Sequence, residues 1–416
     1  MVKQDVKIGI IGAGLSGLSA ALNLEKAGYS PVIFETTSEV GGRVKTDIVE
    51  GYQLDHGFQV LLDAYPKAVE YFDYKDLKLQ RLLPGARIFT GKRTVTVGDP
   101  TRHFPFFLPT LESGVASLRD MYLLWTLHRE LQGMSVEEVF QMSEMTTAEF
   151  LSQKGFSEKI RRSFFSPFFS GIFLEPDLKT SSRMFCFVFK MFGKGYAVIP
   201  RNGMAALPAQ LANKLNNSEI RYNSLVKRVE KGKIVLEGGA DFAFDAALIA
   251  ADAGGLIPDE DEDEIQWHGC DTLYFEAEKR SISEPLIGLV ADPEALVNNI
   301  FFPTSVKSAS RGSKELLSVT VVRDHELSES ELVERVKGEL KEFCGLEDLR
   351  FLKRYHIRKA LPKVDLSGIN LSGTVKKIGK NVFMAGDHLY YGSSNAALHS
   401  GEQAAQAILK YLGTRT

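Results

Sequence analysis

The stretch Lys7-Ile8-Gly9-Ile10-Ile11-Gly12-Ala13-Gly14-Leu15-Ser16-Gly17 decides the fold. Its apolar run favours a buried strand over residues 6–11, and the residues after it favour a helix over 15–27 that ends at Gly28. A second apolar run, Pro31-Val32-Ile33-Phe34, follows this helix. The pattern predicts a βαβ unit, which is the beginning of a parallel sheet covered by helices.

The glycines of this stretch have the spacing of a dinucleotide-binding turn. Gly12 permits a tight turn, Gly14 lets the backbone approach a pyrophosphate, and Gly17 lets the helix pack on the strand. Backbone amides at the start of the helix, around Leu15 and Ser16, can bind the phosphates with help from the helix dipole. A glycine-rich turn without a ligand is the alternative, but the strand, helix and following acid favour a nucleotide site.

That acid is Glu35, at the end of the second strand, where it can accept hydrogen bonds from a ribose. Its charge disfavours the 2′-phosphate of NADP, so FAD or NAD remains. Gly41-Gly42-Arg43 follows shortly after. Two glycines allow close approach of the backbone, and Arg43 can neutralise a diphosphate or lie against a flavin ring, which favours FAD.

With these motifs the chain resembles the superfamily of flavin amine oxidases, protoporphyrinogen oxidases and phytoene desaturases. Near the far end, Phe383-Met384-Ala385-Gly386-Asp387 is similar to that superfamily's C-terminal flavin segment. The resemblance implies that Gly386 and Asp387 lie at the flavin, with Asp387 accepting a hydrogen bond from a ribitol or nearby hydroxyl. It also implies that a helix over about 395–412 begins under the ring with Asn395, Ala396 and Ala397, and that the amides of Ala396 and Ala397 face the N1/C2 edge.

Three further stretches carry the resemblance between these ends. Leu54-Asp55-His56-Gly57-Phe58-Gln59 resembles the loop that brings backbone to the flavin, which implicates Gly57, Phe58 and Gln59. Val226 stands where a strand residue of the superfamily meets the adenine through its main chain. The stretch 195–204 resembles the segment with which the superfamily re-enters its FAD domain.

Departures from the superfamily pattern also carry information. Some members hold flavin covalently through a cysteine near the C-terminal segment, whereas this chain has no cysteine after Cys344, so non-covalent FAD is expected. Tyr390 and Tyr391 follow Asp387 and are candidates for positions near the substrate, although Ser393 makes a full aromatic cage doubtful. We expect Lys359 to be a surface charge, and no catalytic base is assigned.

At least two domains are expected, because 416 residues exceed what one hydrophobic core usually holds, and each is expected to be discontinuous in sequence. Residues 1–85, 190–256 and 355–416 are predicted to form a Rossmann-like FAD-binding domain, an α/β unit with a parallel sheet and helices. Residues 86–189 and 257–354 are predicted to form a substrate-binding domain of mixed sheet plus helices. The phenylalanine-rich stretches 104–107 and 164–169 form either a second core or an apolar substrate cavity. The acidic run Asp259–Glu264 is interpreted as a solvated loop between the domains.

Composition limits the partners. A net charge of −3 argues against nucleic-acid binding, and neither the three scattered cysteines nor the eight histidines have the spacing of a metal site. The N-terminus leaves no room for a secretory signal, and no apolar stretch is long enough to span a membrane, so a cytoplasmic location is expected. Peripheral membrane contact stays open.

The resemblance implies an FAD-dependent oxidoreductase that moves a hydride from a small-molecule substrate to the flavin, with oxygen, a quinone or a protein as the electron acceptor. The phenylalanines favour an apolar or polycyclic substrate, such as an isoprenoid or tetrapyrrole precursor. A flavin amine oxidase is the first alternative. A redox-neutral flavin isomerase or mutase and a flavin-holding subunit without catalysis are two others.

Overall fold

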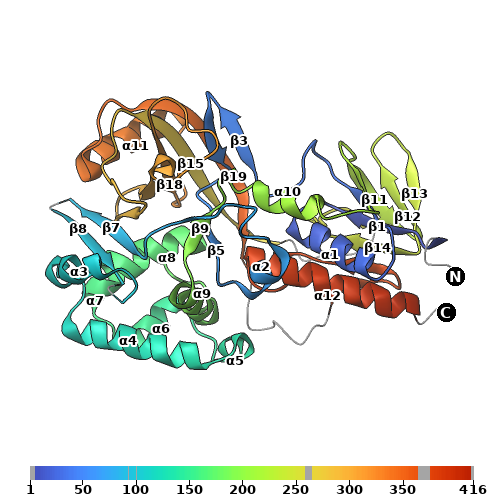
Figure 1. The fold of residues 1–416 in the computed structure, drawn as a ribbon, viewed down its shortest axis with the longest axis horizontal. Helices are drawn as coiled ribbons and strands as arrows, with labels where there is room; N and C mark the ends of the chain where they lie inside the picture. Colours follow the sequence, from blue (N-terminus) through green and yellow to red (C-terminus); the bar gives the residue numbers. More distant parts are fainter. Residues whose placement is uncertain (1–4, 92, 100, 258–264, 364–374, 414–416) are drawn as a thin grey trace.

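A computed structural model describes residues 5–91, 93–99, 101–257, 265–363 and 375–413. Figure 1 shows two large sheets with separate sets of helices and a third, mainly helical region below one of them. The acidic run Asp259–Glu264 lies outside the described residues. The prediction of an α/β fold, with a Rossmann-like sheet beside a mixed sheet, is confirmed.

The first sheet has six strands in the order β10-β2-β1-β14-β21-β20. Its centre is β1, which pairs in parallel with β2 on one side and with β14 on the other, and β14 pairs in parallel with β21. Neighbouring strands therefore come from the beginning, the middle and the end of the chain. The bounds are β1 Ile8–Ile11, β2 Val32–Phe34, β10 Glu219–Arg221, β14 Ala246–Ile249, β20 Lys377–Ile378 and β21 Val382–Met384.

Two helices from opposite ends of the chain pack together beside this sheet, α1 (Leu15–Lys26) and α12 (Ser394–Gly413) (Figure 1). The Ser19 hydroxyl donates to the Leu398 carbonyl at 3.1 Å. A Cβ atom on Gly401 would lie 2.1 Å from the Ser16 carbonyl oxygen, so only glycine permits this approach. The contact places the start of α12 beside the glycine-rich turn before α1.

The second sheet has seven strands in the order β19-β15-β18-β17-β16-β7-β8, and all neighbours are antiparallel except β16 and β7. Helix α11 (Glu329–Cys344) begins with a capping box at Ser328 and packs its apolar side on this sheet. The strand bounds are β7 Gly85–Thr90, β8 Arg93–Gly98, β15 Trp267–Ala277, β16 Ile287–Val290, β17 Val297–Phe301, β18 Glu315–Val321 and β19 Arg350–Pro362.

The third region is made of helices between residues 104 and 194 (Figure 1). Its elements are η2 Phe104–Phe106, α3 Phe107–Ser113, α4 Leu118–Gly133, α5 Val136–Phe140, α6 Thr147–Gln153, α7 Glu158–Ile160, η3 Arg161–Phe165, α8 Ser166–Phe173 and α9 Ser182–Lys194. Three of the expected domain boundaries fall inside elements, because β7 runs from residue 85 through residue 86, α9 runs through residue 190 and β19 runs through residue 355. The division into two domains stays a prediction.

Smaller elements complete the described part of the chain. They are β3 Thr46–Val49, β4 Tyr52–Asp55, β5 Leu61–Leu62, α2 Pro66–Tyr71, β6 Gln80–Arg81, β9 Ala197–Ile199, α10 Ala206–Ala212, β11 Val226–Glu230, β12 Lys233–Leu236, β13 Asp241–Ala243, η4 Pro303–Ser305 and η6 Asp387–Leu389. Among the described residues, no helix combines the length and the apolar character that a membrane crossing needs.

Candidate functional site

A large cavity of about 1570 Å³ connects the three regions. At one end its wall is the glycine-rich turn between β1 and α1 and the loop after β2. In the middle the wall comes from β19 and the segment 385–397, and at the other end it comes from the helices between α3 and α9. The volume suits a dinucleotide at one end and a second molecule at the other.

The turn at Gly12 has the shape that binding a diphosphate requires. A Cβ atom on Gly12 would lie 2.9 Å from the Ala250 carbonyl oxygen, and one on Gly17 would lie 2.0 Å from the Gly12 carbonyl oxygen. Gly14 differs because it lines the cavity and has space around it. The atom nearest to a Cβ added there would be the Gly41 carbonyl oxygen, 4.0 Å away. Within the described part of the chain no side chain caps helix α1, so its first amides remain available at the cavity wall. The site fits a phosphate group.

Glu35 directly follows β2 and lies at the same end of the cavity. Its side chain is buried and held by protein donors: the Ala13 amide donates to Oε2 at 2.9 Å, and the amide and hydroxyl of Thr37 donate to Oε1 at 2.9 Å each. The carboxylate is therefore fixed beside the turn, where free lone pairs can still accept hydrogen bonds from a ribose.

The loop after Glu35 brings Arg43 to the middle of the cavity. Gly41 runs alongside the turn, with its amide donating to the Ala13 carbonyl at 2.9 Å. Arg43 forms an ion pair with the buried Asp387, donates to the Ala360 carbonyl at 3.0 Å, and lies 5.1 Å from the centre of the Trp267 ring. Arg43 and Asp387, which the sequence assigned to the cofactor separately, therefore form one unit.

Helix α12 begins at the cavity, but only some of the residues at its start line the cavity wall. Ser393, Ser394 and Ala397 line the wall, whereas Ala396 is fully buried. Hydrogen bonds from the amides of Ala396 and Ala397 go to Ser393, at 3.0 Å each. Asn395 points into the core, where it donates to the Tyr391 hydroxyl at 2.8 Å.

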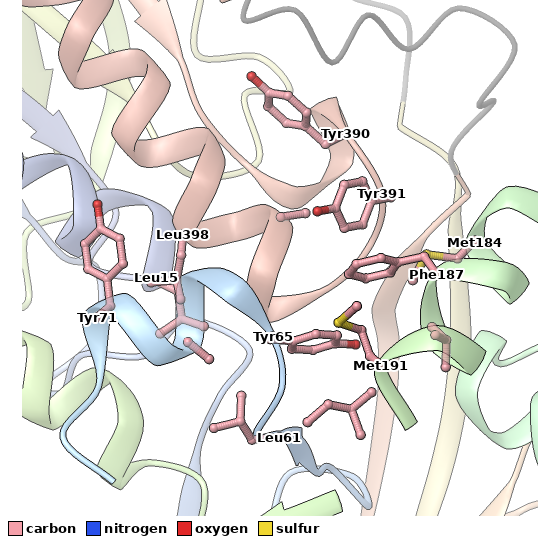
Figure 2. Packing of buried hydrophobic residues seen from close by; sticks show 14 of the residues in the cluster. Leu15, Leu61, Tyr65, Tyr71, Met184, Phe187, Met191, Tyr390, Tyr391 and Leu398 are labelled. Carbon is pink, nitrogen blue, oxygen red and sulfur yellow. The ribbon is translucent and has the colours of Figure 1, made fainter. Parts of the chain in front are cut away.

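Tyr390 and Tyr391 do not line the cavity, although the sequence made them candidates for positions near a substrate. Both rings are buried. Figure 2 shows Tyr391 beside Phe187 of α9, and their ring centres are 5.0 Å apart. Tyr391 also stacks on Phe140 at 4.5 Å, and Tyr390 lies edge-on to His399 at 5.2 Å. The pair joins the C-terminal segment to the helical region as core packing.

The other predicted site residues also divide into some that line the cavity and some that pack in the core. Gly57, Phe58 and Gln59 line the cavity, and the Gln59 amide group donates to the carbonyls of Arg43 and His56 at 3.1 Å each. Val226 begins β11 and packs in the core with Ile11 and Phe34 instead of lining the cavity. Predicted residues that line the cavity are Gly12, Gly14, Leu15, Ser16, Glu35, Gly41, Gly42, Arg43, Gly57, Phe58, Gln59, Gly386, Asp387 and Ala397.

His388 belongs to the cavity wall in a way that no motif indicated. Its ring folds back over Gly386, and a Cβ atom on Gly386 would lie 2.2 Å from it. The Nε2 atom is buried without a hydrogen-bond partner among the described residues. Burial lowers the pKa of His388, and Arg43 lowers it further, against the opposing charge of Asp387. A neutral ring in the middle of the cavity wall follows.

Strand β19 supplies charged residues to the wall that the sequence did not single out. Arg354 donates to the buried Asp271 at 2.6 Å, and His356 lies 3.1 Å from the same carboxylate. Burial acts to raise the pKa of Asp271, but Arg354 and His356 outweigh it and lower the pKa. Lys359, which we expected to be a surface charge, is exposed, pairs with Asp252 and also lines the cavity. Residues 353–361 of β19 all line the cavity, so the strand runs along the wall with both of its sides, which its alternation in the sequence does not indicate.

The helical end of the cavity is apolar. Helices α7 and α8 are joined by the π-helical turn η3, which aligns Ile160, Phe164 and Phe168 along the wall. Phe165, one residue from Phe164, is fully buried and packs against Phe185. The phenylalanine-rich stretch 164–169 therefore supplies both core residues and residues of the cavity wall.

The chain is similar to known proteins over nearly its whole length. The sequence pattern of the family described as flavin containing amine oxidoreductase matches residues 15–409. Protoporphyrinogen oxidase 2 of Arabidopsis thaliana is 23% identical, over 98% of this chain and 94% of its own length. A 4,4′-diapophytoene desaturase of Staphylococcus aureus is also 23% identical, over 61% of this chain and 57% of its own length.

Solved structures share the fold. A putative protoporphyrinogen oxidase from Exiguobacterium superimposes with a TM-score of 0.71 at 16% identity, with 99% of both chains covered. Putrescine oxidase bound to putrescine gives a TM-score of 0.68 at 16% identity, with 97% of this chain and 99% of that chain covered. The family match spans nearly the whole chain, and the turn, Glu35 and the uncapped helix fit its cofactor. The chain belongs to the flavin-containing amine oxidoreductase family and is an FAD-dependent oxidoreductase.

Proposed function

We propose that this enzyme takes a hydride from an apolar substrate, of the size of an isoprenoid or a tetrapyrrole, bound at the helical end of the cavity. One observation carries the proposal: the cavity that begins at the glycine-rich turn continues without interruption between walls of phenylalanine. Phe164, Phe168, Phe189 and Phe192 all face it. Such walls bind molecules by removing apolar surface from water.

The roles of the chain's residues follow from their positions along the cavity. FAD, when bound, supplies the acceptor for the hydride. The free amides of α1 and the charge of Arg43 would hold the diphosphate, and Glu35 would hold a ribose. Asp387 and the segment 393–397 would lie nearer the reacting end. Non-covalent binding is expected, because no cysteine follows Cys344.

The helical end of the cavity offers little to an amine. Asp99 is the one acidic residue among the described lining residues between 82 and 197, and it accepts hydrogen bonds from the amide and hydroxyl of Thr101 at 2.9 and 2.6 Å. Tyr390 and Tyr391, which could have framed an amine, are buried in the core. A protonated amine would lose its hydration there without gaining a dedicated partner.

The test is anaerobic titration of the purified, FAD-loaded enzyme, followed by its visible absorption spectrum. Phytoene and protoporphyrinogen represent the apolar and polycyclic classes, and putrescine represents the amines. Bleaching of the flavin by a member of the first two classes, with putrescine inert, is expected. Bleaching by putrescine alone would refute the substrate class.

The same titration separates the remaining alternatives. An isomerase would leave oxidised flavin unbleached and convert substrate only after the flavin is chemically reduced. A flavin-holding subunit would show bound FAD that none of the three compounds reduces and no turnover in either redox state. Re-oxidation of the bleached enzyme by air, compared with a soluble quinone, then identifies the class of electron acceptor.

A further inference from the structure

One histidine of the cavity wall lies beside a carboxylate of its own. His56 directly follows β4, and Asp47 lies on the paired strand β3, so both side chains come from the end of this hairpin that meets the cavity. The His56 amide donates to the Lys45 carbonyl at 3.0 Å, which fixes the backbone there. The Nε2 atom of His56 is buried and lies 3.0 Å from Asp47 Oδ2, in the geometry of an ion pair and not of a hydrogen bond. A protonated His56 ring is therefore stabilised by the charge beside it.

Tyr355 of β19 joins these two side chains, and the three residues are called the His56 cluster. The hairpin lies against β19 (Figure 1), where the Tyr355 hydroxyl donates to Asp47 Oδ2 at 2.7 Å and the two ring centres of Tyr355 and His56 are 4.3 Å apart. Burial and the nearby Asp47 raise the pKa of Tyr355, so its hydroxyl stays protonated and acts as a donor. Partial burial acts to raise the pKa of Asp47, but Tyr355 and His56 outweigh it and lower that pKa. The cluster therefore holds a charged carboxylate beside an imidazole ring.

The other ring nitrogen of His56 is free to take up a proton. Nδ1 forms no hydrogen bond within the part of the chain that the structure describes, and the side chain is 29% exposed at the cavity wall. When Nε2 faces a carboxylate, the proton of a neutral imidazole resides on Nε2 and the lone pair is on Nδ1. His56 and Asp47 therefore have the arrangement of a general base and the acid that orients it.

Three other described histidines line the cavity, but their surroundings differ. His356 shares its carboxylate with an arginine and with another histidine. The carboxylate beside His388 is already in an ion pair, and His128 has no acidic side chain within ion-pair distance among the described residues. Asp47, by contrast, pairs with His56 and with no described lysine or arginine at that distance. Its charge is therefore available to an imidazolium.

The position of His56 along the wall is also suitable for catalysis. The Gln59 side chain donates to the carbonyls of both His56 and Arg43 at 3.1 Å each, which ties His56 to the loop expected to hold the cofactor. The next residue, Gly57, approaches β19 so closely that a Cβ there would lie 3.2 Å from Ile357 Cδ1. From this point the same cavity continues to the apolar end.

We propose that His56 is the base that takes a proton from the substrate when the neighbouring substrate atom gives its hydride to the flavin. This role rests on the proposed function. The hydride carries two electrons to oxidised FAD, and the electron pair of the bond to the departing proton becomes the second bond of the new double bond. Nδ1 of His56 binds the proton, and Asp47, held by Tyr355, stabilises the imidazolium. The proton then leaves to water, because the side chains of His56 and Asp47 are partly exposed.

Rapid-mixing measurement of flavin bleaching in the FAD-loaded enzyme tests the base. The reductant is whichever of phytoene, protoporphyrinogen and putrescine bleaches the unaltered enzyme. His56→Gln should slow bleaching by about a hundredfold or more, and added imidazole should restore part of the rate to His56→Ala but not speed the unaltered enzyme. The matched control is His103→Gln, which alters a histidine that does not line the cavity and should bleach at the unaltered rate.

The pH dependence of bleaching gives a second readout. Besides the members of the His56 cluster, the titratable groups that interact with it are Asp55, Tyr274 and Lys353. Bleaching of the unaltered enzyme should slow toward acid pH, because a protonated ring cannot take up another proton. His56→Gln should lose this dependence, whereas Asp55→Asn should keep it.

Asp47 and Tyr355 are positioning residues, since they act through His56. Asp47→Asn should slow bleaching about tenfold, and Tyr355→Phe, which keeps the ring beside His56, should slow it less. Glu50→Gln is the control for Asp47, because Glu50 follows β3 on the same hairpin but is exposed and pairs with Arg350. It should leave the rate unchanged.

Two results would overturn the role of His56. One is bleaching of His56→Gln within about threefold of the unaltered rate. The other is a slower rate that imidazole does not restore in His56→Ala and that accompanies an equal loss of FAD affinity in titrations of the apoprotein, which would make the role structural. The substrate class is judged separately, by which compound bleaches the unaltered enzyme. The base and the substrate class can therefore fail independently.

Discussion

Arg43 and Asp387 form an ion pair across 344 residues of sequence. Arg43 belongs to the loop after β2, and Asp387 begins η6 after β21, so the pair joins the first and last thirds of the chain at the cavity wall. Asp387 is buried, and Arg43 is the cation beside it. This part of the cavity wall is therefore assembled from both ends of the chain, and neither end supplies it alone.

Replacing Arg43 by alanine should weaken FAD binding by about ten- to a hundredfold, because the buried Asp387 loses its partner and the diphosphate loses a positive charge. Titration of the apoprotein with FAD measures this. Arg228→Ala, which removes an exposed arginine paired with Glu230, is the control and should leave FAD binding unchanged. Full flavin occupancy of Arg43→Ala would refute its assigned role.

Gly14→Ala and Gly17→Ala should fail in different ways. At Gly14 the added methyl group meets no protein atom closer than 4.0 Å, so the thermal midpoint of the apoprotein should hardly change while FAD affinity falls. At Gly17 the methyl group would lie 2.0 Å from a carbonyl oxygen, so the apoprotein itself should be destabilised or fail to fold. Equal loss of stability in both would contradict the phosphate-binding geometry.

Glu35→Gln keeps the size of the side chain but removes its charge. The amide group can accept hydrogen bonds at only one of its two ends, so the donors from Ala13 and Thr37 can no longer all be satisfied. We expect FAD affinity to fall about tenfold, measured by the same titration. Glu39→Gln alters an exposed glutamate of the same loop and should have no effect.

Phe165 and Phe168 provide a matched pair in the helical region. Phe165 is fully buried, so Phe165→Ala should lower the free energy of unfolding by about 3–5 kcal/mol. Phe168 faces the cavity, so Phe168→Ala should cost less stability and instead raise KM for an apolar substrate. Urea denaturation and steady-state kinetics distinguish the two. The assignment of the wall would fail if Phe165→Ala, and not Phe168→Ala, changed KM at constant stability.

Asp55 predicts a pH dependence of stability. Burial raises the pKa of its carboxyl to about 6, although Thr46, the Met204 amide and His56 oppose the shift. Because the folded-state pKa lies above the usual value near 3.8, the folded protein binds the extra proton, and stability falls as pH rises from about 4 to about 6. Asp55→Asn cannot titrate, so its loss of stability across this window should be smaller by about 2 kcal/mol. Urea midpoints at both ends of the window measure it, and identical slopes for the two proteins would contradict the shift.

Several parts of the site could be predicted because they depend on short-range geometry. The turn at Gly12, the end of β2 at Glu35 and the start of α12 near Asn395 are each set by residues within one strand–turn–helix unit. Their spacing alone places backbone amides and a carboxylate at one edge of a parallel sheet. The fold class followed from these units, and the choice of FAD also needed Gly41-Gly42-Arg43 and the family resemblance.

The remaining features depend on contacts between distant segments. Tyr391 lies four residues from Asp387, yet its ring is drawn into the core by Phe140 and Phe187 of the helical region. Phe164 and Phe165 are neighbours, but the π-helical turn directs one to the cavity and the other to the core. The sequence by itself determined the glycine-rich turn, the acid at Glu35 and the flavin. Only the tertiary structure decided which aromatic rings meet the cavity and that residues 353–361 of β19 run along its wall, because these positions are set by packing against residues far away in the chain.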